Sequence, residues 1–195
     1  MISTLEPNEA QLFYKLWIPF LDYVNQKYRM DLTLEEMGEA LESDVQKVHA
    51  VLNFLKEHPE LFDWYLNTAN LPSEHYEIVA NWKRFVWKDF VLERHLKKGS
   101  SFISVEDRVV YMVKGVRTRF EDMFPWVEPP FRLQAILLPF KGKIICAEVI
   151  SHKKFPVFPY EARYFRGIYR CARLAGVIDK TLLDNSFYNF YKFFD

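Results

Sequence analysis

Cysteine and glycine are both scarce in this chain of 195 residues. The two cysteines, Cys146 and Cys171, form no CxxC pair, which excludes a disulfide-stapled secreted fold and a Cys-rich zinc site. Six glycines leave little room for phosphate-binding loops, and neither GxxxxGK[ST] nor GxGxxG occurs. A GxSxG nucleophile elbow is also absent. We therefore predict no cofactor and no metal, and no catalytic residue can be assigned from spacing.

Long apolar runs are missing as well. No stretch of eighteen consecutive apolar residues occurs, so we expect no membrane span. The first residues lack a basic region followed by an apolar run, so no signal peptide is expected and the predicted location is the cytoplasm. What the chain does have is hydrophobic content: half of its residues are apolar and 17% are aromatic, which excludes disorder for most of it.

Charge is balanced overall but divided along the chain. Residues 1–80 hold five Lys and Arg against fourteen Asp and Glu, whereas residues 81–195 hold twenty-one against twelve. This division predicts either two surfaces with different partners or two lobes that attract each other. Chance scatter of surface charge is the alternative.

Hydrophobic periodicity changes along the chain from helical to strand-like. Helical spacing and capping boxes predict helices over 8–28, 34–41 and 45–56, with a linker at 67–73. A further helix is predicted over about 73–83, followed by strands at 85–96, 101–104, 109–113, 132–138 and 143–150 and by helices at 160–175 and 181–193. This order indicates an α+β fold, in which an N-terminal helical lobe precedes a small curved antiparallel sheet or barrel of about five strands with C-terminal helices. We place an acidic helical lobe at 1–72 and a basic α+β domain at 73–195.

Part of the basic half resembles a known family. The resemblance depends on four sequence segments, which are WKRF at 82–85, RHLKK at 94–98, YMVKG at 111–115 and LLPFKGKII at 137–145. They resemble an uncharacterised bacterial protein family over roughly residues 82–150. Some members of that family carry a separate Cys-rich zinc motif, which this chain lacks, so the resemblance implies the strands and no activity.

The main candidate binding residues are basic. Arg163, Arg166, Arg170 and Arg173 recur at i, i+3, i+7 and i+10, which places four guanidinium groups along one stripe of a predicted helix. The candidate set is completed by lysines near predicted strand ends: Lys141, Lys143, Lys153 and Lys154. Aromatic neighbours such as Phe140 could stack on single-stranded bases. The alternative is that this stripe faces the acidic lobe or water.

Other chemistries have weaker support. Residues 33–63 have the helix lengths of a helix-turn-helix, but two lysines against eight acidic residues would repel a DNA duplex, which favours a helical hairpin that packs or binds protein. Glu93 and His95 are two residues apart and would share a strand face. Cys146, Glu148 and His152 form a loose cluster. Neither group has the further ligands that a metal site needs.

The last segment is aromatic, and it bears on partners. The spacing of its rings predicts one helix face, which either docks on the body of the protein or mediates a homodimer; the rings are Phe187, Tyr188, Phe190, Tyr191, Phe193 and Phe194. Taken together, the leading hypothesis is a non-catalytic binding or adaptor protein with a protein partner. Binding of RNA or single-stranded nucleic acid through the basic half is the alternative, and a hydrolase of unrecognised type is the third.

Overall fold

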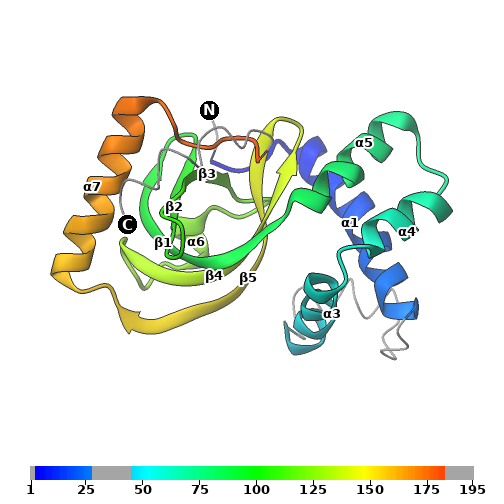
Figure 1. Ribbon diagram of the computed structural model, residues 1–195, viewed down its shortest axis with the longest axis horizontal. Coiled ribbons are helices and arrows are strands. Elements are labelled where there is room, and N and C mark those ends of the chain that lie inside the picture. Colours follow the sequence, from blue (N-terminus) through cyan, green and yellow to red (C-terminus); the bar gives the residue numbers. More distant parts are fainter. Residues whose placement is uncertain (1–2, 28–44, 183–195) are drawn as a thin grey trace. The chain divides into compact units, whose positions relative to one another are not determined.

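The chain forms two compact units, shown in the computed structural model of Figure 1, in which residues 3–27 and 45–182 are described. A helical unit covers Pro7–Lys83, and a barrel unit covers the residues before Pro7 together with those from Arg84 onward. Within the described residues, no helix is both long and apolar enough to cross a bilayer.

The helical unit is built on aromatic packing. Its elements are α1 (Pro7–Lys27), α3 (Val45–Glu57), α4 (Leu61–Thr68), α5 (Ser73–Asn81) and the short 3-10 helix η1 (Trp82–Arg84). Trp82 is buried edge-on against Trp17, with ring centroids 5.2 Å apart, and Phe20 stacks on Phe62 at 4.5 Å. Because Trp82 belongs to this core, the helical unit extends past residue 72, where the sequence interpretation placed the boundary.

The barrel unit holds five strands whose closed order is β1-β2-β3-β5-β4. The elements are β1 (Val86–Leu96), β2 (Gly99–Ser104), β3 (Val110–Lys114), α6 (Phe120–Met123), β4 (Phe131–Phe140), β5 (Lys143–Pro156) and α7 (Pro159–Ala175). The predicted α+β class is confirmed. Neighbouring strands are antiparallel as expected, except that β3 and β5 pair in parallel at Val113 with Ile144 and at Lys114 with Ile145. The predicted helix over 34–41 lies outside the described residues, as does the predicted helix over 181–193 except for Thr181 and Leu182, which form a bend.

A two-residue turn joins β4 and β5. Its residues, Lys141 and Gly142, have φ values of 48° and 72°. Positive φ at both central positions is the geometry whose twist matches that of antiparallel strands. The predicted hairpin therefore forms, and Lys141 occupies a left-handed conformation that a non-glycine residue rarely adopts.

The segment that follows α7 pairs with β3 at residues 110–112, before the part of β3 that pairs with β5. The amide of Met112 donates to the carbonyl of Asp179 at 2.8 Å, and the amide of Asp179 donates to the carbonyl of Val110 at 2.9 Å. The buried Asp179 carboxylate in turn accepts the amide of Thr181 at 2.9 Å. These bonds tie the chain after α7 to the barrel, and so they fix the C-terminal end of that helix.

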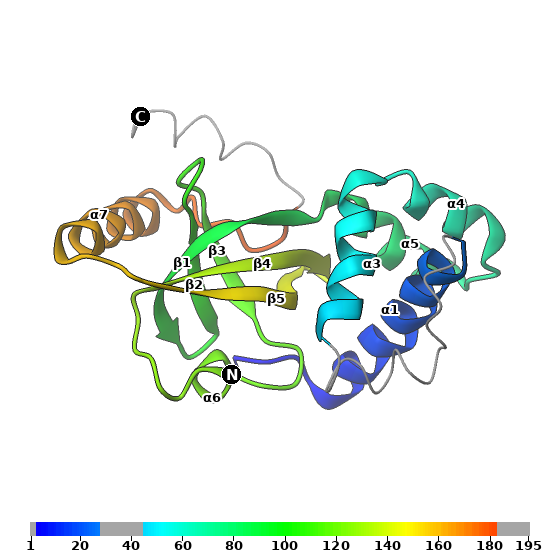
Figure 2. The same cartoon turned by 90° about the horizontal axis from the view of Figure 1, so that it is seen from below.

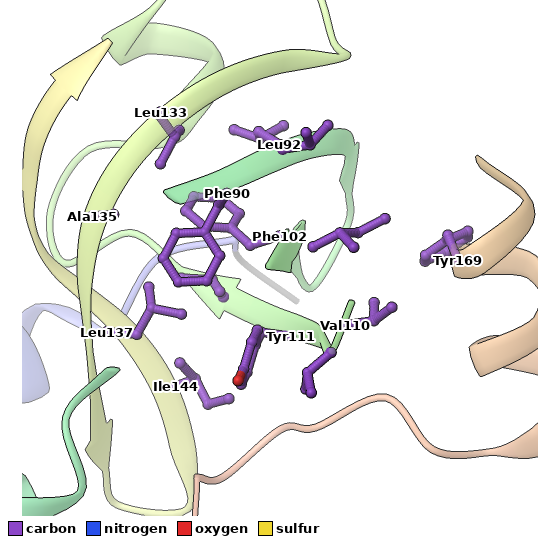
Figure 3. Packing of buried hydrophobic residues seen from close by; sticks show 14 of the residues in the cluster. Phe90, Leu92, Phe102, Val110, Tyr111, Leu133, Ala135, Leu137, Ile144 and Tyr169 are labelled. Atoms are coloured by element: carbon purple, nitrogen blue, oxygen red, sulfur yellow. The ribbon is translucent and has the colours of Figure 1, made fainter. Parts of the chain in front are cut away.

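One apolar core fills the barrel and continues to α7. Phe90, Phe102 and Tyr111 pack within it as tilted and edge-on pairs, with ring centroids 5.7 to 5.9 Å apart. Figure 3 shows these side chains inside the barrel, with Tyr169 reaching toward them from α7. The helix thus covers one end of the core, and the β4–β5 turn lies on the far side of the barrel from it in both Figure 1 and Figure 2.

Candidate functional site

Helix α7 begins and ends with clear local signals. Pro159 stands at its first position, where its missing N–H costs nothing. The carboxylate of Glu161 accepts the amide of Phe158 at 3.0 Å, which satisfies a donor at the N-terminal end. At the other end Gly176 has φ 72°, and the amide of Val177 bonds back to the carbonyl of Ala172 at 3.0 Å. This glycine-capped ending needs a left-handed residue, so Gly176 stops the helix.

One face of α7 is buried in the barrel core. It presents side chains at helical spacing, which are Phe165, Ile168, Tyr169 and Ala172. Polar contacts beside this face hold the helix in place. Arg132 of β4 pairs with Glu161 at 2.6 Å, and Arg108 donates to the hydroxyl of Tyr164 at 3.1 Å. The helix is therefore a fixed part of the barrel unit.

A buried carboxylate joins α7 to β1. Glu93 sits where the β1–β2 register shifts between Leu92 and Arg94, and its side chain is only 2% exposed. It accepts two hydrogen bonds from Arg94 and lies 3.8 Å from the guanidinium of Arg166. Arg94 also stacks over the ring of Tyr169, 4.3 Å from its centroid. The hydrogen bonds that Arg94 donates to Glu93 raise the pKa of Arg94, so this guanidinium stays charged at any ordinary pH.

The four predicted arginines do share one edge of α7. The side chains of Arg163, Arg166, Arg170 and Arg173 are all exposed. Arg166 makes the long contact with Glu93, whereas the other three have no ion-pair partner within residues 3–27 and 45–182. This edge of arginines is therefore exposed to solvent and lies beside the buried face of α7.

The predicted lysines of the β4–β5 turn do not join this edge. Lys141 lies in the β4–β5 turn and Lys143 at the start of β5, on the far side of the barrel from α7. Lys153 and Lys154 lie further along β5, where only the backbone is described. The arginine edge and the β4–β5 turn are thus separate basic regions, because sequence proximity to strand ends does not say which end of a barrel a residue occupies.

A second apolar stripe lies outside the buried face of the helix, with Tyr164 at its edge in contact with Arg108. We call it the outer face of α7, and it comprises Tyr160, Tyr164, Gly167, Cys171 and Leu174. Leu174 is 83% exposed and Tyr160 is 71% exposed, and Cys171 is also exposed. The alternating spacing of four and three residues is that of a helix that packs against another helix. Sequence analysis missed this stripe, although its spacing was visible, because only burial distinguishes it from the face inside the core.

The other sequence candidates make separate contacts. Glu93 pairs with the arginines, whereas Nδ1 of His95 hydrogen-bonds Ser100 at 2.9 Å and lies 3.9 Å from Glu121. Burial lowers the pKa of His95, and the nearby Glu121 carboxylate opposes that effect. Within the described part of the chain, no group of three or more His, Cys, Asp and Glu side chains is placed to hold a metal ion.

Two neighbouring groups on β5 are perturbed by burial. Burial raises the pKa of Glu148 to about 7 and raises the pKa of the Cys146 thiol above its ordinary range. The thiol of Cys146 donates to the backbone carbonyl of Glu148 at 3.3 Å. A buried protonated thiol is a poor nucleophile, so this pair offers packing and no activated cysteine.

Comparison with known proteins identified no similar protein. No family model, no curated protein and no solved structure matches the chain. The resemblance to a bacterial family therefore stays a prediction.

Proposed function

We propose that this chain is a non-catalytic binding protein that recognises a protein partner through the outer face of α7. The observation that carries the proposal is the exposure of Tyr160 and Leu174 at the two ends of a stripe with helix-packing spacing. A single exposed leucine is ordinary, but aligned apolar side chains on one helix favour an interaction site.

The rigidity of α7 supports this role. Its inner face is packed in the core, and the contacts of Glu93, Arg132 and Arg108 hold it along its length. A surface that is already ordered loses little conformational entropy when it binds, so more of the contact energy appears as affinity. Both cysteines are free thiols, which is in keeping with the cytoplasmic location that we propose for this function.

A pull-down with matched variants tests the proposal. Leu174→Asp places a charge on the outer face without touching the core, and Trp126→Asp makes the same change at a residue that is 74% exposed outside α7. We expect proteins retained from the lysate by the wild type and by Trp126→Asp to be lost with Leu174→Asp. Equal retention by all three proteins would contradict the proposal.

Single-stranded nucleic acid is the second candidate, and a specific observation favours it. The exposed rings of Phe158 and Tyr160 stack on each other at 6.0 Å with an interplanar angle of 7°, close in sequence to Arg163. Exposed aromatic rings beside cationic side chains are the elements with which proteins bind single strands. Protein binding ranks first because Leu174 and Cys171 offer a nucleic acid neither charge nor a ring.

Salt dependence distinguishes the second candidate. Binding of fluorescent single-stranded RNA and DNA to the full chain should weaken steeply with salt if phosphates are the ligand. It should also fall in Tyr160→Ala and in Arg163→Gln/Arg170→Gln. Absence of binding at low salt would remove this candidate and leave the protein partner.

A further inference from the structure

The outer face of α7 has small residues in its middle and large side chains at its two ends. Gly167 and Cys171 are small, whereas Tyr160 and Tyr164 at one end and Leu174 at the other are large. A Cβ added to Gly167 would meet no atom within 4 Å, and its backbone φ lies outside the positive range. The fold therefore does not need glycine at this position, and alanine would form a better helix. Small residues at such a position allow a second helix to approach closely.

Arginines line one side of this stripe. Arg163 precedes Gly167 by four residues and Arg170 precedes Leu174 by four, so each guanidinium lies beside the stripe. Both side chains are exposed and have no ion-pair partner in the described ranges, 3–27 and 45–182. The one acidic residue of α7, Glu161, is already engaged with Arg132. In paired helices, charges in these flanking positions select the partner by complementarity.

We infer that the partner segment is an acidic amphipathic helix. Its apolar side chains pack along the outer face over Gly167, and its carboxylates pair with Arg163 and Arg170. This inference rests on the proposed function and names the chemistry of the partner. A second copy of α7 fits less well, because an antiparallel pair would bring arginines opposite arginines. Single-stranded nucleic acid could pair with the arginines and stack on Tyr160, but it would leave Leu174 in water.

A selection from displayed helices tests the chemistry. The probe is a library of peptides about three heptads long, with Leu, Ile or Ala at the a and d positions and Glu, Gln or Lys randomised at the flanking positions. The labelled full chain is the bait. We expect the retained clones to carry Glu at the flanks. Retained clones with Gln or Lys at the flanks, or no enrichment at all, would overturn the inference.

Charge reversal gives the matched comparison. In Arg163→Glu/Arg170→Glu the affinity for an acidic clone should fall roughly tenfold and a lysine-flanked clone should bind instead. The control Lys97→Glu/Lys98→Glu makes the same change in charge at two exposed residues of the β1–β2 turn and should bind as the wild type does. An equal loss in both variants would show that net charge and not the outer face is responsible, which also overturns the inference.

Other occupants of the outer face of α7 would give different results in binding and sedimentation experiments. A dimer in sedimentation that Gly167→Leu converts to a monomer would identify a second copy as the occupant. RNA binding that the arginine reversal abolishes would identify a nucleic acid. Either result overturns the acidic helix. If partner capture still depends on Leu174 while the library shows no preference for acidic flanks, only the acidic helix fails. If capture does not depend on Leu174, the proposed function fails as well.

Discussion

Two faces of α7 are both apolar, but one of them is buried in the core and the other is exposed to solvent. Phe165, Ile168 and Tyr169 close the barrel core, whereas Tyr160 and Leu174 lie in water on the other side of the same helix. Both sets recur at helical spacing. An apolar stripe in the sequence therefore shows only that a helix face is able to pack against another element. Which elements lie next to that face in the fold decides whether it contributes to stability or to binding.

The arginines sharpen this contrast. Arg94 and Arg166 meet the buried Glu93 and belong to the attachment of the helix. Arg163 and Arg170 border the outer face and serve the binding that we propose. Arg163, Arg166 and Arg170, which are close together in the sequence, thus contribute to two different properties. Substitutions on the two sides should separate those properties cleanly.

The largest effect is expected on the inner face. Phe165→Ala removes a buried ring and leaves a cavity between α7 and the barrel, so the free energy of unfolding should fall by about 3 to 5 kcal/mol. Urea unfolding measures the loss, and hydrogen exchange in β3 assigns it to the barrel unit. Leu174→Ser is the control on the outer face and should stay within about 0.5 kcal/mol of the wild type. Equal losses in the two variants would contradict the assignment of the faces.

An intermediate effect is expected at Glu93. Glu93→Gln keeps the shape but leaves Arg94 and Arg166 without their anion, so stability should fall by about 2 kcal/mol. The partial exposure of both guanidinium groups keeps the loss below that of a fully buried pair. Asp122→Asn breaks the exposed pair with Arg119 and should give no measurable change. A wild-type unfolding curve for Glu93→Gln would show that this cluster does not hold α7.

The smallest effect has the opposite sign. Gly167→Ala should stabilise the protein by about 0.5 to 1 kcal/mol, because alanine is the better helix former and its Cβ meets open space. The same methyl group lies on the outer face, where the partner helix approaches. Thermal unfolding should therefore show a higher midpoint while affinity for the partner decreases. A destabilised Gly167→Ala would mean that the protein itself packs against this position.

Much of the barrel unit was predictable from local signals. The strands over 85–96 and 143–150 and the turn between β4 and β5 follow from apolar periodicity and from a lysine-glycine pair suited to positive φ. The parallel pairing of β3 with β5 was not predictable, because it joins residues far apart in the chain. The bulge at Glu93 was missed for the same reason: register belongs to a pair of strands and cannot be seen in one of them.

The candidate site was predicted in part. The arginine edge was found because helical spacing alone places Arg163 and Arg170 together. Lys141 and Lys143 belong to the β4–β5 turn, which lies on the far side of the barrel from α7, and their binding role stays a prediction. The predicted aromatic helix at 181–193, and the homodimer that it would mediate, stay predictions because these residues lie almost entirely outside the described part of the chain.

The amino-acid order accounts for the helix α7, for its caps at Pro159 and Gly176, and for the two apolar stripes and the basic edge along it. These depend on backbone preferences and on neighbours within a few residues. The closure of the barrel decided which stripe is buried, which arginine of α7 contacts Glu93 and which lysines lie away from α7. Closure brings together strands that are distant in the sequence, and burial is a property of that assembly and not of any one segment.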